Sequence, residues 1–272
     1  MRLSVRHSTL YQFDAPMRFV TQSHRLTPAT NGSQKVLDWT ISAEGASFGA
    51  AFVDGAGDHV STMTVPGPTD RIIVAVAGTV ETFGNDGILR RHREVISPRA
   101  YLEATQATQP NRAILGLRDL ALGASGLDRA HRLAAAVADA IAYVPGATTP
   151  HTTAAEALEL GRGVCQDHAH ALVAVAIAAA MPARYVTGYL FTEGAAGGEA
   201  SHAWAEIHVD ELGWIGFDPA NRCCPDERYI RLGSGRDARE AAPIRGVARG
   251  AAAEALDVSV VVAQQERGNS SQ

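Results

Sequence analysis

Cysteine is scarce in this sequence. Three cysteines occur among 272 residues, and two of them, Cys223 and Cys224, are adjacent. Neighbouring cysteines rarely bridge each other, so the composition excludes a disulfide framework and favours a reducing compartment. We therefore expect a cytoplasmic protein. The third cysteine, Cys165, stands alone and needs a separate explanation.

Long hydrophobic runs and clusters of basic residues are also missing. The longest apolar run, Ala171–Met181, is shorter than the roughly 20 residues that cross a bilayer. The first strand-like segment places polar side chains at every second position, which is unlike a signal peptide. The formal net charge is −5, and no run of Lys or Arg occurs, so we expect neither a nucleic-acid nor a membrane partner. The oligomeric state is left open.

What the sequence does contain is enough apolar material for a substantial core, since 46% of its residues are hydrophobic. Alternating apolar and polar residues predict an antiparallel β-sandwich-like domain over residues 1–100, followed by a connector with some helical character over 101–124. Helical periods and then strands predict an α+β core over 125–225. The segment 226–272 is expected to hold one strand, at 256–262, and a frayed end.

Three helices are predicted at the start of this core. Ser125 with Asp128, and Thr153 with Glu156, each have the spacing of a capping box. The third helix opens directly at Cys165, after two glycines in the string "GRGVC".

Cys165 therefore lies where a helix best supports a reactive thiolate. The free N–H groups and the positive dipole end of a helix N-terminus stabilise a thiolate, and they can also bind the oxyanion of a tetrahedral intermediate. The structural alternative is a small buried residue at a helix start, because free cysteine is often buried.

A general base for this cysteine is indicated by two later strands. His202 opens "HAWAEIHV" and Asp218 closes "GWIGFDP", and the tight turn "DELG" joins the two segments as an antiparallel hairpin. The start of the first strand then lies beside the end of the second, so we expect His202 and Asp218 to be cross-strand neighbours. A carboxylate in that place would orient the imidazole, as in a Cys-His-Asp triad.

The strings "GRGVCQDHAHALVAVAIAAAMPARYVTGYL" and "SHAWAEIHVDELGWIGFDPANR" resemble the transglutaminase-like superfamily of papain-fold cysteine enzymes. The opening "LSVRHSTLYQFDAPM" and the segments "YVPGATT" and "GRDAREAAPIRGVARG" are similar to its bacterial two-domain branch, whose members are described as transglutaminase-like enzymes or cysteine proteases. The resemblance covers most of the chain, and the motifs around the cysteine, histidine and aspartate are its most specific part.

The resemblance implies that Cys165 is the nucleophile, His202 the general base and then acid, and Asp218 the orienting carboxylate. It also implies acyl transfer without a cofactor or metal: the thiolate attacks a glutamine carboxamide or a peptide carbonyl, and an amine or water resolves the thioester. A peptide or protein is then the expected substrate, with a preference for hydrolysis. The sequence departs from the family at His168, where an aromatic residue is usual.

Other residues near these motifs have weaker predicted roles. Gln166 is a candidate oxyanion donor, and Tyr143, at an aromatic position near the family's active sites, is another. Trp204 shares a strand face with His202 and is interpreted as core or wall, with substrate-groove lining as the alternative. Asp167 is predicted to cap the helix, and Asn221 is interpreted as a turn residue.

Two alternatives to this picture follow from the same residues. Cys165, His168 and His202 have a conceivable spacing for zinc, whereas His170 lies on a different helix face from His168. We expect no metal, because the cysteine and the His-Asp pair already explain one another. The alternative function is a non-catalytic protein-binding module on a papain-like scaffold, although all three triad residues are present.

Overall fold

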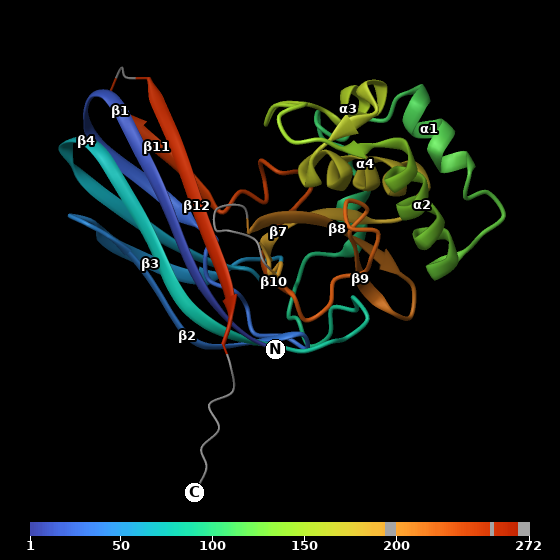
Figure 1. Cartoon of the computed structure of the whole chain (residues 1–272), viewed down its shortest axis with the longest axis horizontal. Coiled ribbons are helices and arrows are strands. Elements are labelled where there is room, and N and C mark those ends of the chain that lie inside the picture. The colour runs from blue at the N-terminus through green and yellow to red at the C-terminus, as the bar shows by residue number, and fades with distance from the viewer. Residues whose placement is uncertain (194–199, 251–252, 266–272) are drawn as a thin grey trace, which may run out of the picture.

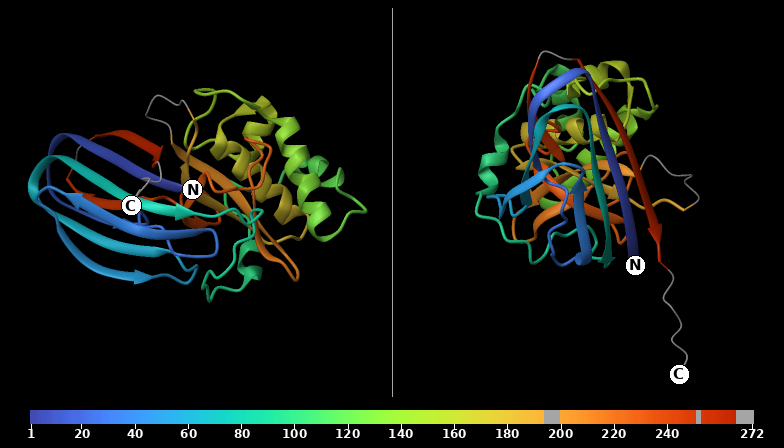
Figure 2. Two further views of the ribbon diagram at one scale, coloured as in Figure 1. Left: turned by 60° about the horizontal axis from the view of Figure 1, so that its bottom comes forward. Right: turned by 90° about the vertical axis from the view of Figure 1, so that its left-hand side faces the viewer.

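The computed structural model describes residues 1–193, 200–250 and 253–265. An antiparallel β part formed largely by the N-terminal segment lies beside a part that combines helices and strands (Figure 1). The helices lie on the side of the molecule away from the N-terminal sheet (Figure 2). The predicted α+β class is confirmed.

The N-terminal part is one continuous antiparallel sheet built on two long strands. β1 pairs with β4 along most of its length, and its first and second halves also pair with β12 and β11. Tyr11 and Val20, from the two halves of β1, belong to one core with Met63 and Ile72 of β4. The two halves of the sheet therefore share one core, so its packing is sandwich-like. Its strands are β1 (Arg2–His24), β2 (Gln34–Ala43), β3 (Ser47–Val53), β4 (His59–Thr82), β11 (Ile244–Arg249) and β12 (Glu254–Gln264).

The second part is a four-stranded antiparallel sheet in the order β10-β7-β8-β9, covered by helices on one face. Helix α4 packs against β7 and β8 and is buried on nearly all sides, because its residues from Ala171 onward are apolar and its polar residues Asp167, His168 and His170 are buried as well. The elements are η1 (Pro98–Leu102), α1 (Arg112–Asp119), α2 (Gly126–Ala140), β5 (Ala142–Tyr143), α3 (Ala154–Leu160), β6 (Arg162–Gly163), α4 (Cys165–Ala178), β7 (Ala183–Leu190), β8 (Ser201–Val209), β9 (Gly213–Phe217) and β10 (Tyr229–Gly235).

The C-terminal segment contains three strands, whereas the sequence analysis expects one. β10 joins the second sheet, while β11 and β12 return to pair with β1. The sequences of β10 and β11, "YIRLGSG" and "IRGVAR", carry glycines and arginines that obscure the period of two. The C-terminal strands therefore complete the sheet that the N-terminal segment begins.

The two predicted capping boxes have different outcomes. At α3, Thr153 and Glu156 bond each other's backbone as predicted. At α2, Ser125 makes no side-chain cap bond, and the Asp128 carboxylate instead accepts from Arg132 one turn along the helix. The α2 prediction is wrong because an i, i+4 ion pair on the exposed face takes the acidic side chain.

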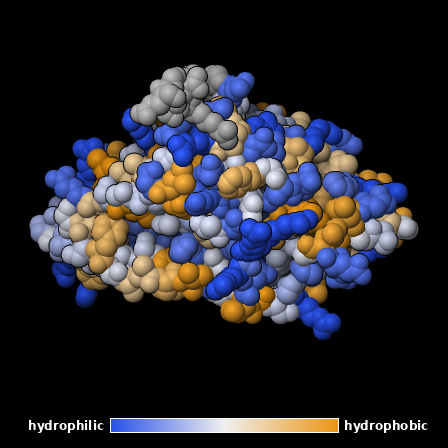
Figure 3. All heavy atoms as spheres, turned by 90° about the horizontal axis from the view of Figure 1, so that it is seen from below, coloured by the Kyte–Doolittle hydropathy of each residue, from blue (hydrophilic) through white to orange (hydrophobic). Residues whose placement is uncertain are grey.

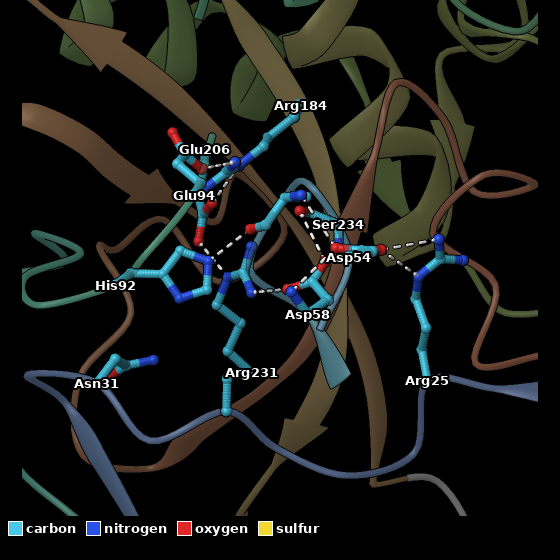
Figure 4. Close-up of polar contacts among 12 residues, drawn as sticks. Arg25, Asn31, Asp54, Asp58, His92, Glu94, Arg184, Glu206, Arg231 and Ser234 are labelled. Carbon is cyan, nitrogen blue, oxygen red and sulfur yellow. Dashed lines mark hydrogen bonds and ion pairs between the residues drawn. The ribbon is translucent and has the colours of Figure 1, made fainter. Parts of the chain in front are cut away.

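Two buried arginines connect the two parts of the molecule. Arg231 of β10 donates to Asp58, in the loop between β3 and β4, at 2.6 Å and to Glu206 of β8 at 2.9 Å (Figure 4). Arg184 of β7 donates to the other oxygen of Glu206 and to Glu94, both at 2.6 Å. Asp58 and Arg184 are fully buried. This cluster fixes the β3–β4 loop onto the strands of the second sheet.

The described residues include no helix that is both long and apolar enough to pass through a membrane. The face drawn in Figure 3 interleaves small hydrophobic groups with hydrophilic ones. Scattered apolar side chains of this kind are normal on a protein surface.

Candidate active site

The N-terminus of α4 is held in place by its own first turn and by a neighbouring loop. The Asp167 carboxylate accepts from the backbone N–H of Val164 at 2.8 Å and from the Thr148 hydroxyl at 2.6 Å. A Cβ on Gly163 would lie 2.6 Å from the same carboxylate oxygen, so only glycine fits there. Asp167 thus caps the helix, and the chain enters it at Cys165 in a fixed direction.

Beside this helix end, His202 of β8 and Asp218, just after β9, form a direct pair. The distance from His202 Nε2 to Asp218 Oδ2 is 2.6 Å, and both side chains are largely buried. The β8–β9 register pairs Ala205 with Phe217, so Asp218 lies diagonally across from His202 and not directly opposite it. Diagonal neighbours in a sheet are within reach of long side chains.

Two further residues hold the Asp218 carboxylate, and the sequence analysis gave neither of them this role. The Tyr229 hydroxyl of β10 donates to Asp218 Oδ2 at 2.8 Å, and the Asn221 side-chain amide donates to the same oxygen at 2.8 Å. The Asn221 backbone N–H donates to Oδ1 at 3.2 Å. Asn221 is therefore a turn residue that also secures Asp218, and a buried carboxylate with several donors keeps its charge.

These contacts set the charge of the pair. Burial opposes an imidazolium at His202, but hydrogen bonds to Asp218 and to Cys165 outweigh it and raise the pKa of His202 to about 9. Burial also opposes ionisation of Asp218, yet the bonds from His202, Asn221 and Tyr229 hold its pKa below the ordinary value. At neutral pH the ring is an imidazolium next to a carboxylate. Since Nε2 bonds Asp218, Nδ1 is the ring nitrogen left for Cys165.

Cys165 and His202 line one cleft of about 520 Å³ between the two parts of the molecule. One side is formed by the start of α4 and by β7 and β8, including Tyr185 and Thr187. The other side is formed by β1 and β12 of the N-terminal sheet. The predicted nucleophile is therefore partly exposed and faces a space large enough for part of a peptide.

The two candidate oxyanion donors lie in different places. Gln166 lines the cleft, but its side-chain amide donates to the carbonyl of Pro150 at 3.1 Å. Its backbone N–H and that of Cys165 belong to the first helical turn, where no intrahelical acceptor is available. Tyr143 is half exposed and pairs with Gly163 just before α4, and it is not among the described residues that line the cleft.

His168 is buried and turned away from the triad. Its Nδ1 lies 2.9 Å from the carbonyl oxygen of Val164, and its Nε2 lies 3.0 Å from that of Ile141. Its ring is near that of Tyr143, with centroids 6.3 Å apart. Both ring nitrogens therefore lie against backbone carbonyl oxygens, so the contacts of His168 are structural.

The remaining candidates are structural in their contacts. His170 accepts from the backbone N–H of Ala238 at 3.0 Å, and burial lowers its pKa to about 4. Trp204 is buried, stacks on His202 with centroids 6.4 Å apart, and does not line the cleft. Among the described residues, no group of three His, Cys, Asp or Glu side chains is arranged to hold a metal ion.

The structure thus brings together a cysteine at a helix start and a histidine-aspartate pair carried by an antiparallel sheet. Two family descriptions match the chain: "Transglutaminase-like superfamily" over residues 118–219, and "Bacterial transglutaminase-like N-terminal region" over residues 3–81. The chain belongs to the transglutaminase-like superfamily and carries the bacterial N-terminal region.

Individual proteins are also similar to this chain. An uncharacterised protein of Mycobacterium leprae is 30% identical over 96% of this chain and 98% of its own length. An uncharacterised protein of Mycobacterium tuberculosis is 38% identical over 39% of this chain and 37% of its own. The fold is similar to the crystal structure of a "Putative Cysteine Protease" from Cytophaga hutchinsonii, with a TM-score of 0.72 at 21% identity, covering 98% of this chain and 92% of the other.

Proposed function

We propose that this protein is a cysteine-dependent enzyme that attacks a glutamine carboxamide or a peptide bond of a peptide or protein, with hydrolysis as the main outcome. The observation that carries the proposal is the shared cleft of Cys165 and His202, with Asp218 bound 2.6 Å from the far side of the imidazole. Each role of a thiol nucleophile and its paired base then has a residue in the right place.

In the first half of the proposed reaction, the Cys165 thiolate adds to the substrate carbonyl carbon. The positive His202 ring and the start of α4 stabilise the thiolate. Negative charge moves to the carbonyl oxygen, where the free N–H groups of the first turn are the available donors. His202 then gives its Nδ1 proton to the leaving amine, the carbon–nitrogen bond breaks, and a thioester remains on Cys165.

In the second half, neutral His202 removes a proton from water, and the resulting hydroxide equivalent attacks the thioester. The carbon–sulfur bond breaks, the carboxylic acid leaves, and His202 is again an imidazolium beside the thiolate. Partial exposure of Cys165 supports hydrolysis, because water can reach the thioester. An amine entering the same cleft would give transamidation instead. Asp218 keeps the ring oriented through both halves.

The test compares wild type, Cys165→Ala and Cys224→Ala on a glutamine-containing donor peptide, with and without a labelled primary amine. Cys224 is a second half-buried thiol of the described chain that does not line this cleft, so it is a matched control. Ammonia release without label incorporation indicates an amidase, ammonia release with label incorporation a transglutaminase, and backbone cleavage a peptidase. We expect Cys165→Ala to abolish turnover and Cys224→Ala to retain it.

The alternative is the non-catalytic protein-binding module. It would be established if wild type and Cys165→Ala bound peptides equally well and neither protein gave ammonia release, label incorporation or cleavage. Turnover that persists in Cys165→Ala would exclude Cys165 as the nucleophile.

A further inference from the structure

We infer that the cleft selects peptides with an uncharged, apolar side chain next to the scissile amide, and that strand β12 of the N-terminal sheet supplies the wall that reads it. The inference rests on the proposed function for the position of the scissile bond. It concerns the substrate class, which the triad alone does not define.

The first observation is the absence of fixed charge around the cleft. Among the described lining residues there is no Lys, Arg, Asp or Glu, and the Cys165–His202 pair supplies the charge at the reacting end. The other histidine of the lining, His7, bonds Tyr189 at 2.8 Å and Thr9 at 2.9 Å, and burial lowers its pKa to about 4. His7 is therefore neutral at neutral pH, and a charged substrate side chain would lose water without gaining a partner.

The second observation is an exposed pair of apolar side chains on β12. Leu256 pairs with Tyr11 of β1, and Val258 pairs with Thr9, so these four side chains share the face that lines the cleft. Leu256 is 57% exposed and Val258 is 41% exposed. They are the most exposed large apolar side chains among the described residues of the cleft, and an apolar substrate side chain would cover them.

The third observation is that this wall has a fixed position. Leu3 and Val5 of β1 pack with Tyr189, Ile230 and Leu232 of the second sheet in one buried cluster. The arginine cluster of Figure 4 ties the β3–β4 loop to the same sheet. The N-terminal sheet is thus held against the catalytic strands, so β12 meets the substrate as a preformed surface, which limits the ordering cost of binding.

The test uses blocked hexapeptides with one central glutamine, flanked on both sides by Leu, Phe, Glu or Lys. Binding to Cys165→Ala is measured by fluorescence anisotropy, so that it does not depend on turnover. We expect the Leu and Phe peptides to bind at least about tenfold more tightly than the Glu and Lys peptides, as covering one large apolar side chain allows.

A matched pair of variants assigns the preference to β12. Val258→Glu, made in the Cys165→Ala protein, is expected to remove the apolar preference. Val261→Glu is expected to retain it, because Val261 is also 41% exposed but lies on the opposite face of the strand. Val258→Thr, which keeps the side-chain volume, replaces the Glu variant if that variant does not fold. It is expected to weaken the apolar preference.

Equal affinity for apolar and charged peptides, no binding of any peptide, or an equal loss in both Glu variants would overturn the inference. Turnover of the same peptides by the wild type separates the two proposals. Turnover without an apolar preference would reject the β12 subsite and leave the proposed enzyme intact. An apolar preference in binding with no turnover would reject the enzyme and leave the subsite.

Discussion

Replacement of Arg231 by Met removes the guanidinium at the centre of the buried cluster while retaining an unbranched apolar stem. The Arg231 side chain is 5% exposed and binds Asp58 and Glu206. In the variant, the fully buried Asp58 carboxylate keeps Ser234 as its hydrogen-bond donor, and the Glu206 carboxylate keeps Arg184. Breaking a buried pair by removing one partner costs about 3–5 kcal/mol, so we expect a loss of that size in the free energy of unfolding.

The pH dependence gives a second measure of the same cluster. Burial favours the neutral form of Glu206, but the charges of Arg231 and Arg184 dominate and lower its pKa from 4.5 to about 2. That difference corresponds to about 3 kcal/mol, at about 1.36 kcal/mol per pH unit. Because the folded-state pKa is the lower one, this stability is present above pH 4.5 and is lost as pH falls through 2. In Arg231→Met the pKa of Glu206 should rise, so less of this stability is present at neutral pH and its loss is complete at a higher pH.

Urea denaturation followed by tryptophan fluorescence measures both effects. The control is Arg132→Met, which breaks the exposed Arg132–Asp128 pair on α2 and should cost no more than about 1 kcal/mol. If Arg231→Met is destabilised no more than Arg132→Met, or if its acid limb does not move, the cluster does not hold the two parts together as reasoned here.

Two further predictions concern the site itself. Tyr229→Phe removes one hydrogen-bond donor to Asp218 and should raise the pKa of that carboxyl group. The acid limb of the pH profile of kcat/KM should therefore move to higher pH. An unchanged acid limb would show that the Tyr229 hydroxyl does not support Asp218. Asp167→Ala removes the cap of α4 and should lower the free energy of unfolding by about 1–2 kcal/mol. Alkylation of Cys165 should also become slower. Unchanged stability and an unchanged alkylation rate would show that the cap does not position the helix start.

The features predicted from local pattern are those the structure bears out most directly. The turn "DELG" fixes the β8–β9 hairpin, so the proximity of His202 and Asp218 follows from a short range of sequence. The capping box of α3 follows from the spacing of Thr153 and Glu156. Residues within about 20 positions of each other meet at little cost in loop-closure entropy. The predicted α2 cap is the exception, because Arg132 takes the Asp128 carboxylate.

The features that escaped prediction depend on a strand whose pattern is hidden or on contacts between distant segments. Tyr229 reaches Asp218 only because β10 crosses to the edge of the second sheet, and its glycines hide the strand pattern. Leu256 and Val258 reach the cleft because β12 returns to pair with β1. Burial of the two arginines could not be predicted from composition either, because arginine is mostly exposed in proteins and is buried only where charged partners from several strands meet. None of these partners is adjacent in sequence.

The central claim is that His202 activates Cys165, and the most direct measurement is the rate at which iodoacetamide alkylates Cys165 at pH 6, located by peptide mapping. At this pH, about 0.3% of a free cysteine is thiolate. His202, with a pKa of about 9, is an imidazolium there and stabilises the reactive form. We predict that Cys165 reacts at least about tenfold faster than a cysteine in a blocked peptide, and that His202→Gln abolishes the difference. Equal rates for Cys165 in wild type and in His202→Gln would contradict the account.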